Sequence, residues 1–274
     1  MGCKSFLPLV LVAAFTGLSI SSRVKAQPEL QTLTKDQIKL FLRTARVIKS
    51  RPITEGSTEP WCLTLSDGNV THDAAFQTID MRRRTFQLEG GRTEVNFVDS
   101  YLYNIAAFDL AELLGLDDMV PVTVERRWRS KTGALSWWID AKWDENSRQK
   151  QGLRAPDLDA WNKQIFKVRV FAELICDTDR NRGNLLITED WNLWMIDFTR
   201  AFRRWHKLEA PPGLKKCDRR LFEKLKQLRK ADVEQSLTRH LSGWEIEALM
   251  ARRDLIVAHF EKLIAARGEK AVLY

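Results

Sequence analysis

The chain has 274 residues, of which 44% are hydrophobic and 29% are charged, a composition that excludes disordered and fibrous proteins. Its formal net charge is +8, with 44 lysines and arginines interspersed among 36 acidic residues. Because the two signs of charge are mixed along the chain, we expect solvated surfaces and no nucleic-acid binding.

The N-terminus has the three parts of a secretory signal peptide, and we assign residues 1–26 to it. Lys4 supplies a positive start, residues 6–20 form an almost unbroken apolar run, and Val24-Lys25-Ala26 ends with the small residues that a signal peptidase recognises. Cleavage is expected before Gln27, which leaves an exported, periplasmic or secreted protein without a membrane span. The alternative is an uncleaved anchor, although the apolar run is shorter than the roughly 20 residues that a span needs.

The next part of the chain predicts short strands around one central helix. A capping box at residues 34–37 (Thr-Lys-Asp-Gln) indicates a short first helix. From Val47 to Phe97, β-branched and aromatic runs alternate with turn sequences such as Ser-Asp-Gly-Asn at 66–69, which is typical of antiparallel hairpins. Ser100 is expected to begin a helix and Gly115 to end it.

Two more strands are expected at Val120–Trp128 and Ala134–Ala141, and after Asp157 the pattern becomes helical. A second capping box at residues 242–245 (Ser-Gly-Trp-Glu) predicts a long last helix through Ala265. The fold class predicted is therefore α+β, with strands first and helices afterwards.

The chemistry concentrates in residues 176–198. A helix end leads into a polar loop with Asp179 and Asn184, and a short apolar strand, a turn and a second strand deliver Asp197. Such a hairpin would bring Asn184 and Asp197 close together. Phosphoryl transfer needs these groups, because one carboxylate orients the attacking group while an amide oxygen and a second carboxylate hold Mg²⁺ against the phosphates.

The sequence D-R-N-R-G-N at 179–184, followed by I-D-F at 196–198, resembles the motifs of the phosphoinositide 3-/4-kinase and HipA-like superfamily of atypical kinases. The resemblance implies a two-lobed protein-kinase-like fold, with a small β-rich N-lobe at 27–140 and a helical C-lobe at 141–274. It also implies that Asp179 is the catalytic aspartate and that Asn184 and Asp197 are the metal ligands. ATP with Mg²⁺ or Mn²⁺ would be bound between the lobes.

The first lobe departs from this family pattern. The phosphate-binding lysine is expected on the strand at 74–80, where Gln77 stands, and its glutamate partner aligns with Asn104. Glu112 lies too far along the helix to replace it, and Asn181 stands where the loop motif has a histidine. An amide can hydrogen-bond to a phosphate but cannot neutralise its charge, and charge stabilisation is usually the largest catalytic contribution.

Other residues are candidates for completing a nucleotide site. Arg126 and Arg200 are candidate substitutes for the missing positive charge. Gly56 and Ser57 lie where a turn covering the phosphates belongs, although an ordinary hairpin turn explains them equally well. Trp138 and Ile139 belong to the segment that would join the lobes and meet an adenine ring.

Three functions stay open at this point. The first is an exported kinase-like phosphotransferase acting on an unknown protein, lipid or small-molecule acceptor, with adenylyl transfer as a variant on the same metal ligands. The second is a pseudokinase that binds nucleotide as a scaffold, which Gln77 and Asn104 favour. The third is a basic envelope protein that binds an anionic polymer through Lys215–Lys230.

Overall fold

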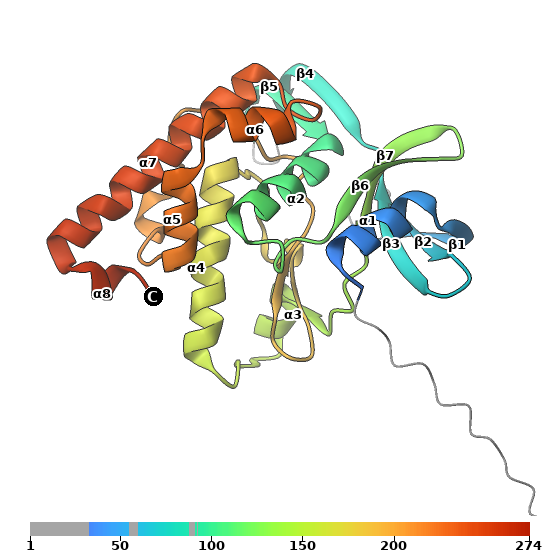
Figure 1. The fold of residues 1–274 in the computed structure, drawn as a ribbon, viewed down its shortest axis with the longest axis horizontal. Helices are drawn as coiled ribbons and strands as arrows, with labels where there is room; N and C mark the ends of the chain where they lie inside the picture. Colours follow the sequence, from blue (N-terminus) through green and yellow to red (C-terminus); the bar gives the residue numbers. More distant parts are fainter. Residues whose placement is uncertain (1–32, 55–59, 88–90, 92) are drawn as a thin grey trace, which may run out of the picture. The chain divides into compact units, whose positions relative to one another are not determined.

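A five-stranded antiparallel sheet dominates the first half of the computed structural model, which describes residues 33–54, 60–87, 91 and 93–274 (Figure 1). The predicted signal peptide and the candidate turn residues Gly56 and Ser57 lie outside the described residues. The order of the strands across the sheet is β1-β2-β3-β7-β6, and each neighbouring pair runs antiparallel. The strands of this sheet are β1 (Arg46–Pro52), β2 (Trp61–Ser66), β3 (Thr71–Gln77), β6 (Thr123–Trp128) and β7 (Lys131–Trp137).

The turn sequence at 66–69 forms a hairpin, as predicted. Between β2 and β3, Asp67 Oδ1 accepts hydrogen bonds from the backbone N–H groups of Asn69 and Val70 at 2.8 Å each, and Gly68 has a φ of 97°. A separate two-stranded ribbon, β4 (Asp80–Gln87) and β5 (Thr93–Ser100), follows β3 and leads into the central helix.

The boundaries of β6 and β7 differ from those predicted for these two strands. Trp128 pairs with Lys131 across a tight turn, so β7 begins at Lys131 rather than at Ala134 and already leaves the sheet after Trp137. The preceding strand starts at Thr123 instead of Val120, and its paired register with β7 begins with Thr123 opposite Ser136.

Two helices accompany the sheet. The predicted capping box opens α1 (Lys35–Thr44), which packs against β6 and β7. The central helix α2 (Leu102–Leu114) starts one residue later than predicted, because Tyr101 and not Ser100 is its N-cap; Gly115 ends it in the left-handed conformation, as expected. This helix is buried almost all round, which fits its position between the sheet and the helices α5 and α6.

The rest of the chain is mainly helical, as predicted, around a small three-stranded sheet of order β10-β9-β8. The predicted capping box begins α7, but the short α8 follows it, so α7 is not the last helix. These elements are β8 (Trp143–Asp144), α3 (Glu145–Lys150), α4 (Leu158–Ile175), the 3-10 helix η1 (Arg182–Asn184), β9 (Leu185–Ile187), β10 (Leu193–Met195), η2 (Pro211–Gly213), α5 (Arg219–Gln227), α6 (Lys230–Leu237), α7 (Gly243–Arg267) and α8 (Glu269–Val272).

One continuous apolar core joins these parts, and residues Thr34–Tyr274 form one compact unit. Cys62, Cys176 and Cys217 are buried in it as free thiols, and burial raises the pKa of Cys217 to about 12. Among the helices that the structure describes, none is long and apolar enough to cross a membrane.

Candidate active site

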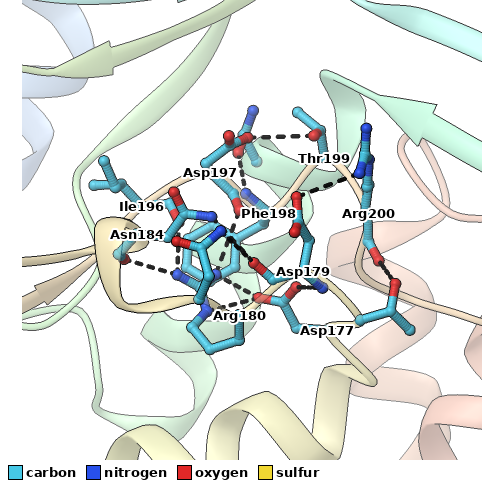
Figure 2. A network of polar contacts seen from close by, with 12 residues as sticks. Asp177, Asp179, Arg180, Asn184, Ile196, Asp197, Phe198, Thr199 and Arg200 are labelled. Carbon is cyan, nitrogen blue, oxygen red and sulfur yellow. Dashed lines mark hydrogen bonds and ion pairs between the residues drawn. The ribbon is translucent and has the colours of Figure 1, made fainter. Parts of the chain in front are cut away.

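The loop after α4 is organised by Arg180, whose side chain is only 9% exposed. Its Nε donates to Asp177 Oδ2 at 2.7 Å, and its Nη1 donates to the backbone carbonyls of Asn184 (2.8 Å) and Ile196 (2.7 Å). One guanidinium therefore ties the start of β9 to the end of β10 (Figure 2). The centroid of the Phe198 ring lies 4.6 Å from the centre of the same guanidinium, a cation–π contact.

This loop and hairpin bring Asp179, Asn184 and Asp197 together. The backbone N–H of Ile196 donates to the Asn184 carbonyl at 3.1 Å, and Asn184 Nδ2 donates to the Asp179 carbonyl at 3.2 Å. With its amide nitrogen engaged, Asn184 could offer a cation its side-chain oxygen. Asn181 plays a local part, because its Oδ1 accepts from Gly183 N–H at 2.8 Å and caps η1.

Asp197 is held in a strained and half-buried position. Its φ is 55°, in the left-handed region that a residue with a side chain seldom adopts, and such residues are frequent at functional sites. Both hydrogen bonds to its carboxylate end on Oδ1, from Gln77 Nε2 at 3.4 Å and from Thr199 Oγ1 at 3.2 Å. Burial raises the pKa of this carboxyl group above its ordinary value.

The donor atoms fit a hard cation that is completed by a ligand. Asp197 and Asn184 offer oxygen, which Mg²⁺ and Mn²⁺ prefer. Within the described ranges, no three His, Cys, Asp or Glu side chains gather to make a metal site by themselves. Magnesium commonly binds through one or two carboxylates plus phosphates of the substrate, so this set suits a metal–nucleotide complex better than a free ion.

Gln77 and Asn104 meet beside Asp197. Asn104, in the first turn of α2, donates from Nδ2 to Gln77 Oε1 at 2.7 Å, and its Oδ1 accepts from the backbone N–H of Phe198 at 2.8 Å. Gln77 ends β3 and donates onward to Asp197. Glu112 lies toward the other end of α2, where it pairs with Lys39 at 2.7 Å.

The two candidate arginines lie in different places. Arg200 donates from Nε to Asp99 Oδ2 at 2.9 Å, and its Nη1 lies 3.5 Å from Asp179 Oδ2, so its charge belongs to the cluster (Figure 2). Arg126 does not fit its assignment. Its guanidinium donates to the carbonyls of Leu42 and Ala45 at 2.6 Å each, because the end of α1 presents carbonyls that need donors.

The predicted adenine contacts lie in the segment between β7 and β8. The backbone N–H of Trp138 donates to the Asp73 carbonyl at 3.2 Å, and the Ile139 carbonyl accepts from Ala141 N–H at 2.9 Å. These two backbone groups are therefore already paired within the protein. The guanidinium of Arg51 lies 5.6 Å from the Trp138 ring.

Sequence reasoning missed three residues that position this site. Arg180 lies inside the motif, so its place there was the available signal. Asp99 of β5, whose side chain is 2% exposed, holds Arg200 in an ion pair. In the sequence Asp99 simply follows an apolar pair, a pattern that does not indicate a site residue. Gly133 on β7 lies so close to β3 that a Cβ would come within 2.2 Å of the Gln77 carbonyl oxygen.

Comparisons with known proteins show the fold. No protein-family model and no curated protein matches the sequence. A structure of hydra Fam20 with sugar superposes with a TM-score of 0.65 at 14% identity, over 87% of this chain and 91% of that one. The Golgi casein kinase with Mn/ADP bound gives 0.60 at 14% identity, over 87% and 78%. The Helicobacter pylori proinflammatory kinase CtkA gives 0.50 at 11% identity, over 82% and 98%.

The chain thus has a kinase-like α+β fold, with a β-rich sheet region and a helical part, and the predicted fold class is confirmed. Identities of 11–14% support no statement beyond the fold.

Proposed function

We propose that this chain is an exported kinase-like phosphotransferase that binds ATP with Mg²⁺ or Mn²⁺ at Asp179, Asn184 and Asp197. The observation that supports the proposal is the Arg180 network, which joins the loop and the hairpin that carry these three residues. Asn184 and Asp197 would hold the metal ion, and the half-exposed Asp179 would orient the attacking group of the acceptor.

The nucleotide would lie between the β-rich lobe, proposed as residues 27–140, and the helical lobe, proposed as 141–274. Gln77 reaches the cluster from the first lobe and Arg200 from the second. Arg200 is the proposed source of positive charge for the phosphates. The neighbour that carries Mn/ADP supports the choice of a divalent metal and an adenine nucleotide.

The motifs at 179–184 and 196–198 support a finer relation to phosphoinositide 3-/4-kinases and HipA-like kinases. Export rests on the signal peptide proposed for residues 1–26. It agrees with a neighbour named for the Golgi, a compartment of the secretory pathway.

A nucleotide-binding scaffold is the second candidate, and one contact favours it. By the family resemblance, the Gln77–Asn104 amide pair takes the place of a lysine–glutamate ion pair, so this pair would offer the phosphates hydrogen bonds but no charge. Adenylyl transfer on the same metal ligands is a third outcome, which differs in the bond of the triphosphate that breaks.

The test is a thermal-shift titration of Gln27–Tyr274 with metal alone, with ATP alone and with both. A ligand at 100 times its Kd stabilises by about 2.7 kcal/mol, which raises Tm by about 5–10 °C for a protein of this size. We expect a shift only with metal and ATP together, because the protein alone supplies few metal ligands. Asp197→Ala should lose that shift.

Glu189→Ala is the matched control, since Glu189 is an exposed carboxylate of the same hairpin and pairs with Lys142 at the surface. A shift that survives in Asp197→Ala would overturn the site. No shift with any nucleotide in the parent would leave a kinase-shaped scaffold. Where binding is found, release of ADP indicates phosphoryl transfer and release of pyrophosphate indicates adenylyl transfer. Asp179→Ala should abolish either transfer while much of the binding persists.

A further inference from the structure

The two faces of the five-stranded sheet have different surroundings, and the register of the strands assigns each side chain to one of them. Side chains directly opposite each other in antiparallel strands share a face, and successive side chains along a strand alternate. Trp137 of β7 lies on the face that α1 covers, since its ring centroid is 5.8 Å from that of Phe41. Gln77 of β3 lies on the other face, where it donates to Asp197. We call this second face the Gln77 face.

One row of side chains across the Gln77 face begins with Arg51. Arg51 of β1 is opposite Cys62 of β2. Cys62 is in turn opposite Ala75 of β3, which is opposite Ser136 of β7. Ala75 precedes Gln77 by two residues, so this row lies about 7 Å along β3 from the contact with Asp197. The other three members of the row are small and uncharged, so its charge comes from Arg51.

The side chain of Arg51 extends across the Gln77 face toward the segment that follows β7. Its guanidinium carbon lies 5.6 Å from the centre of the Trp138 ring. The backbone of Trp138 still belongs to the edge of the sheet, because its N–H donates to the Asp73 carbonyl at 3.2 Å. Since β2 and β3 separate β1 from β7, their backbones are roughly 14 Å apart. Arg51 and Trp138 therefore meet over β2 and β3.

Both side chains of this pair are accessible to a ligand. Arg51 is exposed and Trp138 is half-buried. Within the described ranges, Arg51 forms no ion pair; Asp73, an acidic residue of the same face, accepts instead from Cys62 Sγ at 3.4 Å. The distance of 5.6 Å also exceeds the roughly 3.5–4 Å of a tight contact, so the guanidinium lies beside the centre of the indole without covering it closely.

An arginine next to a tryptophan is a suitable surface for a nucleobase. Guanidinium planes and indole rings both stack on bases, and stacking depends little on which base is present, because every base has a π-face. Hydrogen bonds to the backbone would distinguish the bases more sharply. However, the N–H of Trp138 and the carbonyl of Ile139 are already paired within the protein. Stacking is therefore the main contact that this segment offers a base.

We propose that Arg51 and Trp138 hold the nucleobase by stacking, and that the site accepts GTP as well as ATP. This inference rests on the proposed function, because the phosphates must lie at Asp197 for the base to reach the segment after β7. It adds a base-contacting residue from β1 that neither motif marks, and it widens the nucleotide substrate from an adenine nucleotide to purine nucleoside triphosphates.

Isothermal titration calorimetry of Gln27–Tyr274 tests the inference with the Mg²⁺ complexes of ATP, GTP and inorganic tripolyphosphate, which has phosphates but no base. Arg51→Ala removes the guanidinium, and Arg51→Lys keeps the charge but loses the planar group. Arg129→Ala is the matched control, because Arg129 also contacts a tryptophan, with its guanidinium carbon 4.3 Å from the Trp128 ring centre. That tryptophan contacts Phe76 on the opposite face of the sheet.

We expect the parent to bind ATP and GTP with Kd values within about fivefold of each other. Arg51→Ala and Arg51→Lys should each weaken the binding of both nucleotides about tenfold and that of tripolyphosphate less than about twofold. Arg129→Ala should bind all three ligands like the parent.

The opposite results separate this inference from the proposed function. An equal loss for tripolyphosphate, or full recovery in Arg51→Lys, would show that Arg51 acts through its charge on the phosphates, and would overturn the stacking role. A larger preference for either nucleotide would show that hydrogen bonds distinguish the bases, and would overturn the acceptance of both. Nucleotide binding that is unchanged in Arg51→Ala would overturn this inference alone, whereas no nucleotide binding by the parent would overturn it together with the proposed function.

Discussion

Asn104 Nδ2 donates a 2.7 Å hydrogen bond to Gln77 Oε1, and this contact joins the first turn of α2 to the end of β3. Each of these two amides makes one further hydrogen bond. Asn104 Oδ1 accepts from the backbone N–H of Phe198, and Gln77 Nε2 donates to Asp197 Oδ1. The central helix, the sheet and the proposed metal ligand are therefore connected without any charged group. Replacing the two amides by charged residues therefore tests whether this contact affects nucleotide binding.

Replacing both amides by a lysine–glutamate pair should strengthen nucleotide binding. In Gln77→Lys/Asn104→Glu, the ammonium group would reach the phosphates and the carboxylate would hold it while still accepting from Phe198 N–H. Because a hydrogen bond to a charged group contributes about 1.5–3 kcal/mol, we expect the Kd for Mg-ATP to fall about tenfold or more. Isothermal titration calorimetry measures it. Gln77→Lys alone is the control and should gain less, since its ammonium would face the Asn104 amide donor. An unchanged Kd in the folded double variant would show that this pair does not face the phosphates.

Removing the Arg200 side chain should destabilise the protein through its buried partner. Arg200→Ala leaves Asp99, 2% exposed, as an uncompensated charge, and breaking such a pair costs about 3–5 kcal/mol. The expected loss in Tm is about 6–20 °C. Asp99→Asn/Arg200→Met removes both charges and should recover most of the stability, but it should still lose nucleotide transfer, because the positive charge beside Asp179 is gone. Transfer at the parental rate in this double variant would refute the role proposed for Arg200.

Much of the framework could be predicted because it depends on residues close together in the sequence. The capping boxes at Thr34 and Ser242 satisfy backbone donors within one helical turn, so four-residue patterns locate both helix starts. The hairpin of β9 and β10 is likewise local, and it alone suffices to bring Asn184 near Asp197. Gln77 and Asn104 are 27 positions apart, and they were predicted as a pair because they align with the lysine and glutamate positions of the family pattern.

The sequence is least informative about contacts between distant parts of the chain. Arg126 is a candidate charge substitute because it lies near the end of a strand, yet its guanidinium donates to the carbonyls of Leu42 and Ala45, which are 84 and 81 residues away. Asp99 and Arg200 are 101 residues apart, and no local pattern marks them as partners. The Asp99–Arg200 pair depends on how the ribbon β4–β5 is placed against the loop after β10. Composition and periodicity do not encode this placement.

Gly133 should tolerate no side chain, because β7 approaches the last residue of β3 at this point. A Cβ would lie 2.2 Å from the Gln77 carbonyl oxygen, and because this atom belongs to the backbone it cannot shift inexpensively. Gly133→Ala should lower the free energy of unfolding by about 1–3 kcal/mol or more and displace Gln77 from Asp197. Chemical denaturation measures the first effect and titration with Mg-ATP the second. Thr132→Ala is the control, since Thr132 is exposed on the same strand. Parental stability in Gly133→Ala would show that the two strands separate easily.

Asp197→Asn should separate stability from ligand binding. Both hydrogen bonds to Asp197 end on Oδ1, and an asparagine oxygen can accept both, whereas the substitution removes a charge that burial disfavours. Because the folded-state pKa is raised, the protonated form is the one that folding favours; this stabilisation is complete at low pH and is lost as the pH rises through the folded-state pKa. Without ligand, Asp197→Asn should therefore melt at or above the parental Tm at neutral pH, and the difference should vanish toward about pH 4.

The same raised pKa should make the parent lose affinity for Mg-ATP as the pH falls, since the metal binds the ionised carboxylate. The Asp197→Asn variant should show no metal-dependent shift in Tm at any pH. Thermal melts across this pH range, with and without Mg-ATP, measure both effects. A ligand-free Asp197→Asn protein that melts well below the parent at neutral pH would mean that the ionised carboxylate is stabilised by its surroundings, and that burial does not control its pKa.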